Sequence, residues 1–477
     1  MALLPILFFI FAALLIGWII PTRWRIWVVL TISLLAVYWL QTDLAIRNLA
    51  FWLSTVSIVL TLATWAITRP SHRNNDINQK DWRIVLLFIG GFILLIGLTR
   101  YFGPLCCLTT YRPPELFRVI IFLVLGGGIA LAPVVFPNAK RIFSTLAILL
   151  IIAIFIILKS PILLQSASSG LRGLTGQPIE LANSQDIIWF GFSFLAFRLL
   201  HALFDYRNGK LPAYNLEEFL VYGLFFPTLP AGPIDRSQRF IGDLRQPKGE
   251  PAQNRLQGLQ RILLGLFKKF FLADSLALIA LNSQNAAQVN STFWMWIVLY
   301  AYALRIYFDF AGYTDLAIGL GKFIGINLPE NFDRPYLKQN MTAFWNSWHI
   351  TLAQWFRAYW FNPIVRSMRT RFKAIPAWVV ILFAQFTTMM LIGLWHGITW
   401  NFAIWGAWHG LGLFIHNRWS DWIRPRLDGR SSQPGVNRAL QVGGWFLTFN
   451  FVSLGWVWFA LPTVSLSLDV FQKLFGI

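Results

Sequence analysis

Residues 142–158 read IFSTLAILLIIAIFIIL, a run without a charged side chain that begins after Lys140-Arg141 and ends before Lys159. It approaches the roughly 20 apolar residues that an α-helix needs to cross a bilayer. Comparable runs predict further spans at residues 1–20, 24–40, 44–67, 82–98, 116–136, 187–204, 262–281, 293–310, 376–395, 398–415 and 442–461. The sequence therefore predicts an all-α, polytopic membrane protein with about 11–12 transmembrane helices.

The composition of the 477 residues excludes a soluble globular protein. Hydrophobic residues make up 56% and charged residues 13%, and the charged share is about half of that in soluble domains. The two cysteines, Cys106 and Cys107, are adjacent and therefore poorly placed to bridge each other, so we predict neither a structural disulfide nor a metal site.

The net charge of +20, from 40 Lys and Arg against 20 Asp and Glu, would suggest nucleic acid in a soluble protein. In a membrane protein, basic residues mark cytoplasmic loops and meet anionic lipid, so we expect membrane lipid and no nucleic acid as a partner. Arg23 and Arg25 follow a first span that carries no signal-peptide cleavage site. We therefore expect a multi-pass protein of the inner (plasma) membrane with its N-terminus outside.

No internal repeat or linker divides the chain, which predicts a single integral membrane domain over residues 1–477. Within it we expect peripheral N-terminal spans at 1–185, a core at 186–461 and a short C-terminal tail at 462–477. Residues 219–229 are apolar but too short to span, and Pro227, Pro230 and Pro233 interrupt the segment. We predict that this segment is re-entrant or interfacial.

Four of the six histidines lie in the last third of the chain, at His349, His396, His409 and His416. Ionisable groups in membrane segments are costly, so each one is a functional hypothesis by default. His396 and His409 are 13 residues apart and would point to different faces of one helix. His409 and His416 would share a face, which favours a packing role for them.

His349 belongs to residues 341–361, which the sequence predicts to be one helix with Trp345 and His349 on one face and Asn346 nearby. Two interpretations remain open. The helix could line a cavity from which its aromatic side chains exclude water. Alternatively, it could lie in the membrane interface with its tryptophans at headgroup level.

His396 lies in Gly393-Leu394-Trp395-His396-Gly397, where two apolar runs meet. Glycines allow a close approach of backbone or ligand, and an imidazole can act as a general base near neutral pH. A core histidine bonded to a carbonyl is the alternative. The sequence contains no nucleophile elbow, phosphate-binding loop, dinucleotide fingerprint or H-E-x-x-H motif, which favours direct transfer over a covalent enzyme intermediate.

Four stretches of this sequence resemble the membrane-bound O-acyltransferase family, in particular its bacterial branch of alginate O-acetyltransferases and teichoic acid D-alanyltransferases. They are FFPTLPAGPIDR (225–236), YFDFAGYTD (307–315) running on to NFDRPY (331–336), FWNSWHITL (344–352), and GLWHG (393–397) followed by WGAWHG (405–410). The likeness extends from about residue 190 to 460, whereas the preceding spans match in hydropathy alone.

The resemblance implies a many-helix fold around a central cavity, in which the acyl donor and the acceptor arrive from opposite sides. The family's invariant histidine maps onto His396 and its second conserved polar position onto His349, which predicts these two as catalytic residues. We expect the substrate-binding or cavity-lining residues to be Trp345, Asn346, Trp348, Arg357, Trp395 and Asp309.

Our hypothesis is that His396 takes the proton of an acceptor hydroxyl as its oxygen attacks an acyl thioester, while His349 binds or polarises a reactant. We expect no tightly bound cofactor; the donor, acetyl-CoA or an acyl carrier thioester, is a co-substrate, and the acceptor is an extracytoplasmic polysaccharide. An extracytoplasmic acyltransferase partner is a further expectation. The basic cluster, as we call it, consists of Arg366, Arg369, Arg371 and Lys373. It either anchors the cytoplasmic side of the protein or docks an acidic carrier protein or coenzyme A.

Three alternatives remain open at this stage. Within the family, the chain could transfer D-alanine to teichoic acid instead of acetyl to a polysaccharide. A polysaccharide or lipid transporter would also have about a dozen spans, although the sequence shows no repeated halves. A haem- or quinone-binding redox protein would use the spacing of His396 and His409.

Overall fold

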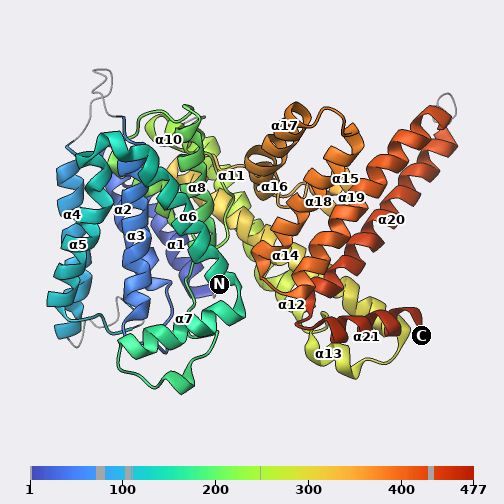
Figure 1. Cartoon of the computed structure of the whole chain (residues 1–477), viewed down its shortest axis with the longest axis horizontal. Helices are drawn as coiled ribbons and strands as arrows, with labels where there is room; N and C mark the ends of the chain where they lie inside the picture. Colours follow the sequence, from blue (N-terminus) through green and yellow to red (C-terminus); the bar gives the residue numbers. More distant parts are fainter. Residues whose placement is uncertain (1–2, 71–80, 103–108, 110, 248, 428–433) are drawn as a thin grey trace. The chain divides into compact units, whose positions relative to one another are not determined.

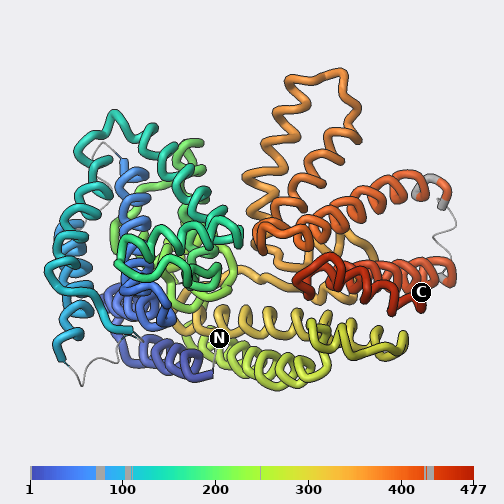
Figure 2. The backbone as a smooth tube through the Cα atoms, turned by 60° about the horizontal axis from the view of Figure 1, so that its bottom comes forward, coloured from blue at the N-terminus to red at the C-terminus, as the bar shows by residue number. Residues whose placement is uncertain are grey.

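The computed structural model describes residues 3–477 except 71–80, 103–108, 110, 248 and 428–433. Cys106 and Cys107, considered above, lie outside the described residues. Every regular element in the described part of the chain is helical (Figures 1 and 2). The predicted all-α class is therefore confirmed.

The chain forms two compact units, residues 1–262 with 316–328 and residues 263–315 with 329–477. We call them unit 1 and unit 2. Helices α11 and α14 contribute residues to both units. The expectation of a single membrane domain stays a prediction.

The helices of the first part of the chain begin and end as follows: α1 Leu3–Trp18, α2 Thr22–Trp39, α3 Leu49–Thr68, α4 Trp82–Leu98, η1 Thr99–Tyr101, α5 Leu116–Val135, η3 Pro137–Ala139, α6 Lys140–Lys159, α7 Pro161–Leu174, η4 Ile179–Leu181, α8 Phe192–Arg207, α9 Leu216–Leu224, η5 Phe226–Thr228, α10 Ser237–Arg245 and α11 Pro251–Leu266.

The remaining helices are η6 Phe267–Ala273, α12 Asp274–Ala277, α13 Ser283–Gln288, α14 Thr292–Ile324, η7 Pro335–Leu337, α15 Met341–Trp345, α16 Ile350–Phe356, η8 Arg357–Phe361, α17 Asn362–Arg371, α18 Ala377–His396, α19 Trp400–Leu427, α20 Pro434–Ala460 and α21 Val464–Phe475. The elements η6 and η8 are π-helical, and the other η elements are 3₁₀ turns.

Six helices in the described part of the chain are long and apolar enough to cross a membrane. They begin at Leu49, Trp82, Leu116, Pro137, Ala377 and Gly435. The sequence predicted about 11–12 spans. The other predicted spans are helical over most of their length, but their helices are shorter, as α1 is, or more polar, as α14 and α19 are.

Helix α3 is the buried helix of unit 1 and shows how polar residues are accommodated in an apolar environment. The hydroxyls of Thr55, Thr61 and Thr64 each donate to the carbonyl four residues earlier, at 2.8 Å. Because each of these three hydroxyls donates to a carbonyl of its own helix, its donor needs neither water nor a partner helix.

Residues 216–229 form the short helix α9 and the turn η5, and all of them are buried in unit 1. The segment therefore lies inside unit 1, and its predicted re-entrant or interfacial position with respect to the membrane stays a prediction. The segment is held by Arg198, which is 1% exposed and whose guanidinium donates to the carbonyls of Gly223 and Thr228, both at 2.9 Å. Irregular backbone is tolerated at membrane depth where the protein supplies such bonds.

Unit 2 contains the histidine-bearing helices. Helices α18, α19 and α20 pack side by side, drawn in orange to red in Figure 1. The preceding helix α17 packs against α18, and the two form the orange hairpin of Figure 2.

Candidate active site

The crossing of α18 and α19 positions His396. Gly393 on α18 and Gly406 on α19 lie so close that a Cβ added at Gly393 would be 2.3 Å from the carbonyl oxygen of Phe402 and 3.2 Å from the Gly406 Cα. Helices approach this closely only where both carry small residues. His396 is the last residue of α18, so the crossing determines where its ring lies.

The imidazole of His396 is half-buried among aromatic rings. Its ring centroid is 4.4 Å from that of Trp395, 4.6 Å from Phe459 and 5.6 Å from Trp405. Such a wall excludes water from one side of the imidazole and lowers the local dielectric, which strengthens every polar interaction that the ring makes.

The predicted continuous helix over residues 341–361 is wrong. Helix α15 ends at Trp345, and α16 begins only at Ile350. His349 has φ 43° and ψ 53°, a left-handed conformation that interrupts an α-helix. The backbone N–H of Ile350 donates to the carbonyl of Asn331 at 2.9 Å, and that of Asp333 donates to Ser347 at 3.0 Å. A loop from earlier in the chain therefore provides the partners that a continuous helix would have supplied.

A second irregularity follows at residues 357–361, where the helix becomes π-helical. Pro363 lies at the start of α17. Proline cannot donate to the carbonyl four residues earlier and its ring crowds that position, which accounts for the widened turn. Arg357 begins this turn.

His349 is 4% exposed, and its ring lies against two aromatic rings. The centroid of Phe310 is 4.7 Å away in an edge-to-face arrangement, and that of Trp395 is 6.0 Å away. The Nδ1 atom is 3.1 Å from the Asn331 Oδ1. The Nε2 atom is buried and has no hydrogen-bond partner among the described residues.

Trp395 brings the two predicted catalytic histidines together. Its ring contacts both imidazoles, so their centroids are no farther apart than the sum of the two distances, 6.0 and 4.4 Å. They come from separate segments, one from the α15–α16 break and one from the end of α18. Their catalytic roles stay a prediction.

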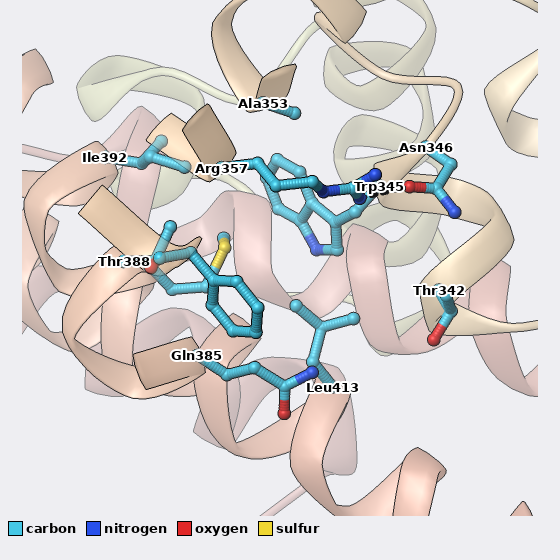
Figure 3. A pocket seen from close by; sticks show the side chains of 11 residues that line it. Thr342, Trp345, Asn346, Ala353, Arg357, Gln385, Thr388, Ile392 and Leu413 are labelled. Carbon is cyan, nitrogen blue, oxygen red and sulfur yellow. Dashed lines mark hydrogen bonds between the residues drawn. The ribbon is translucent and has the colours of Figure 1, made fainter. Parts of the chain in front are cut away.

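A cavity of about 260 Å³ lies beside this aromatic wall (Figure 3). Arg357 extends past the Trp345 indole and donates to the Asn346 Oδ1 at 2.7 Å. The Gln385 Oε1 and the Trp345 Nε1 are buried without a partner among the described residues. The lining residues are Thr342, Trp345, Asn346, Ala353, Arg357, Phe361, Gln385, Thr388, Met389, Ile392 and Leu413.

Three of the residues predicted to line a cavity do line this one, namely Trp345, Asn346 and Arg357. The two histidines do not. Trp345 connects the cavity to His396 through Trp405, since its ring contacts that of Trp405 at 5.8 Å and Trp405 contacts His396 at 5.6 Å.

The other predicted lining residues lie elsewhere in unit 2. Trp348 packs between Phe344 and Trp456, with centroids at 5.7 and 5.1 Å. Asp309 forms an ion pair with Lys269 on the π-helical segment η6. Trp395 contacts the histidines directly but not the cavity.

The basic cluster lies on and just after helix α17, and all four of its side chains are exposed. The described ion pairs include none of the four. The cluster is therefore an accessible positive surface whose role, anchor or docking site, stays a prediction.

Sequence reasoning missed Asn331 and Gln385, and it favoured a packing role for His409. Asn331 stood inside one of the family-like stretches but was not singled out. Gln385 is a lone amide in an apolar span, and the rule that polar groups in spans are functional candidates would have found it. His409 is fully buried and neither of its ring nitrogens has a partner among the described residues, which its sequence position did not reveal.

Metal chemistry finds no support in the described part of the chain, where no three His, Cys, Asp or Glu side chains gather closely enough to hold an ion. The site that the structure offers consists of imidazoles, indoles, amides and one guanidinium. Imidazole and amide groups move protons and bind carbonyls, which suits transfer of an acyl group.

The chain belongs to the membrane-bound O-acyltransferase family, whose model matches residues 140–455. It is 34% identical to the probable alginate O-acetylase of Pseudomonas aeruginosa over 63% of this chain and 54% of that protein. It is 35% identical to the teichoic acid D-alanyltransferase of Streptococcus thermophilus, over 57% of this chain and 68% of that protein.

The peptidoglycan O-acetyltransferase of Helicobacter pylori is 34% identical, over 57% of this chain and 49% of that protein. The chain thus spans about half the length of the alginate and peptidoglycan relatives that it matches. The matching region contains the cavity, both catalytic candidates and the basic cluster.

Proposed function

We propose that the chain transfers an acyl group from a cytoplasmic thioester to a hydroxyl of an extracytoplasmic polysaccharide, and that this group is acetyl. The names of all three relatives describe acyl transfer, two of them acetyl transfer, and the named polymers belong to the cell envelope. The observation that carries the proposal is the contact of one indole, that of Trp395, with the imidazoles of both His349 and His396.

In the proposed reaction, the acceptor oxygen attacks the thioester carbonyl, a C–O bond forms and the C–S bond breaks. His396 takes the proton of the hydroxyl and returns it to the departing sulfur, so the products are an ester and a free thiol. His349 binds the reactant on the opposite wall. A positioned general base of this kind contributes about 10²–10⁴-fold in rate.

The cavity supports the proposal that the donor binds beside the aromatic wall. Its volume of about 260 Å³ lies below the range typical of whole drug-sized ligands, so it suits the slender thioester arm of a donor. Gln385 and Thr388 line it and can bond the amides of such an arm. Because neither imidazole lines the cavity, transfer requires a movement that brings the thioester to His396.

The basic cluster supports the proposal that an acidic carrier protein or coenzyme A docks on the cytoplasmic side. Exposed cations attract an anionic partner over about one Debye length and so raise its association rate. Membrane lipid and an extracytoplasmic acyltransferase are the other partners in this proposal, in the inner membrane with the N-terminus outside.

The test uses the source cells with His396→Ala placed in the chromosomal copy. Mild alkali releases ester-linked groups from the isolated envelope polymers, and acetate and D-alanine are quantified separately. Loss of acetate alone supports the proposal, whereas loss of D-alanine alone supports the teichoic acid alternative, which the relative from Streptococcus favours. Unchanged levels of both, with the variant present in the membrane fraction, would refute acyl transfer at this site.

A further inference from the structure

Asn331 is a fully buried residue that connects two segments of the site. Its backbone carbonyl accepts from the N–H of Ile350 at 2.9 Å, and its side-chain oxygen accepts from the N–H of Thr351 at 3.2 Å. The Thr351 hydroxyl reaches the same oxygen at 2.9 Å. Asn331 therefore caps the N-terminus of α16 from outside that helix, since the first N–H groups of a helix have no partner within it.

These bonds determine the orientation of the Asn331 amide. A backbone N–H can only donate, so the side-chain atom that faces Thr351 must be the oxygen and not the nitrogen. The His349 Nδ1 lies 3.1 Å from that same oxygen. A carbonyl oxygen can only accept, and consequently Nδ1 must carry the hydrogen of this bond.

The protonation state of the other ring nitrogen, Nε2, follows. A neutral imidazole has one N–H, and burial among Phe310 and Trp395 disfavours the charged form. Because Nδ1 holds the hydrogen, Nε2 is left with a lone pair. This is the atom that is buried without a partner among the described residues.

The structure maintains this arrangement at a cost. The left-handed backbone of His349 is strained for a residue with a Cβ. The Asn331 Nδ2 is also buried without a partner among the described residues, and an unpaired buried donor is unfavourable. Such strain concentrates at functional sites.

We propose that Asn331 is a positioning residue that keeps His349 in the tautomer with Nδ1 protonated, so that Nε2 accepts a hydrogen bond from a second hydroxyl of the acceptor sugar, beside the hydroxyl whose proton His396 takes. The inference rests on the proposed acyl transfer. It assigns His349 to the acceptor and not to the thioester carbonyl, because an Nε2 without hydrogen cannot donate to a carbonyl oxygen.

Two substitutions separate this role from a structural one. Asn331→Asp keeps the shape and the accepting oxygen but places a negative charge against Nδ1–H, which favours the imidazolium. The acidic limb of the pH profile of kcat should therefore move to higher pH by about 1–2 units. Asn331→Leu removes the acceptor, and kcat should fall about 10–100-fold, as it does when an orienting partner of a histidine is lost.

Asn340 provides a matched control. It caps α15, its Oδ1 accepting from the N–H of Ala343 at 2.8 Å, and none of its described bonds reaches a histidine. Asn340→Asp should leave the pH profile unchanged. A profile for Asn331→Asp that coincides with those of the wild type and of Asn340→Asp would overturn the proposal.

A second measurement does not depend on activity. The chain has six histidines, so ¹⁵N-histidine labelling of the detergent-solubilised protein gives few signals, and His349→Gln identifies the one that matters. The wild type should show a protonated Nδ1 and an unprotonated Nε2, and Asn331→Leu should show a mixture. A wild-type signal with Nε2 protonated would overturn the inference. If the wild type shows the expected tautomer, with Nδ1 protonated, but transfers no acyl group, the assignment of the tautomer holds and the proposed function alone is refuted.

Discussion

Gly393→Ala is the substitution that most directly tests how the site is built. The added Cβ would lie 2.3 Å from the carbonyl oxygen of Phe402 and 3.2 Å from the Cα of Gly406. Both are backbone atoms, so no side-chain rotation can relieve the contact. The two helices must therefore separate where α18 crosses α19.

The expected magnitude follows from these distances. Ordinary van der Waals contact begins at 3.4 Å, so α18 and α19 must move apart by about 1 Å, and overpacking of this kind costs about 1–3 kcal/mol. His396 lies three residues further along α18 and would move with it. A misplacement of about 1 Å lowers catalysis by about 100-fold.

The assay is thermal unfolding in detergent, followed by the fluorescence of the 24 tryptophans, together with the ester content of envelope polymers. Gly443→Ala is the matched control, because nothing lies within 4 Å of a Cβ at that position of α20. The control should be unchanged or stabilised by up to about 1 kcal/mol, since alanine favours helix. If Gly393→Ala unfolds at or above the temperature of the control, the close crossing is not a feature of the protein.

Reversal of the basic cluster to glutamate should raise the KM for the thioester donor without changing kcat, and high salt should have the same effect on the wild type; an unchanged KM would leave the cluster as an anchor alone. The Arg172 guanidinium bonds Asp186 and holds the pKa of that carboxyl below its usual range. The ion pair therefore stabilises the folded protein above the ordinary carboxyl pKa, and this stabilisation is lost as the pH falls through the lowered pKa. The unfolding temperature should therefore fall more steeply below about pH 4 in the wild type than in Asp186→Asn, and equal slopes would contradict the linkage. Arg198→Met should destabilise unit 1 by about 1–3 kcal/mol for each of the buried carbonyls of Gly223 and Thr228, because they lose this donor, whereas the exposed control Arg207→Met should have little effect on the unfolding temperature.

The transmembrane helices were the most predictable part of the fold. Helix α4 has the predicted bounds, and α6 extends the predicted 142–158 by only two residues at its start and one at its end. Hydropathy and length are local properties, and in lipid a helix is the only structure by which a single segment satisfies its own backbone. The predicted spans at 293–310 and 398–415 are also helical, within α14 and α19, although polar residues stand among their apolar ones.

The candidate site was predictable in its residue types but not in its geometry. The clustering of histidines and aromatic residues identified the segments around His349 and His396. The helical pattern also placed Trp345 and His349 on one continuous helix, which the structure breaks between them. Periodicity could not reveal the break, because the partners that stabilise it come from Asn331 and Asp333, outside the segment.

Sequence alone determined that the protein is helical, that it belongs in a membrane and that its imidazoles are concentrated in one region, since each of these follows from composition or from spacing along the chain. Only the tertiary structure decided that Trp395 lies against both imidazoles, that Trp345 lines a cavity which neither imidazole lines, and that Asn331 bonds His349. The physical reason is that hydropathy acts residue by residue, whereas the direction of a lone pair depends on hydrogen bonds between segments that meet only when the chain folds.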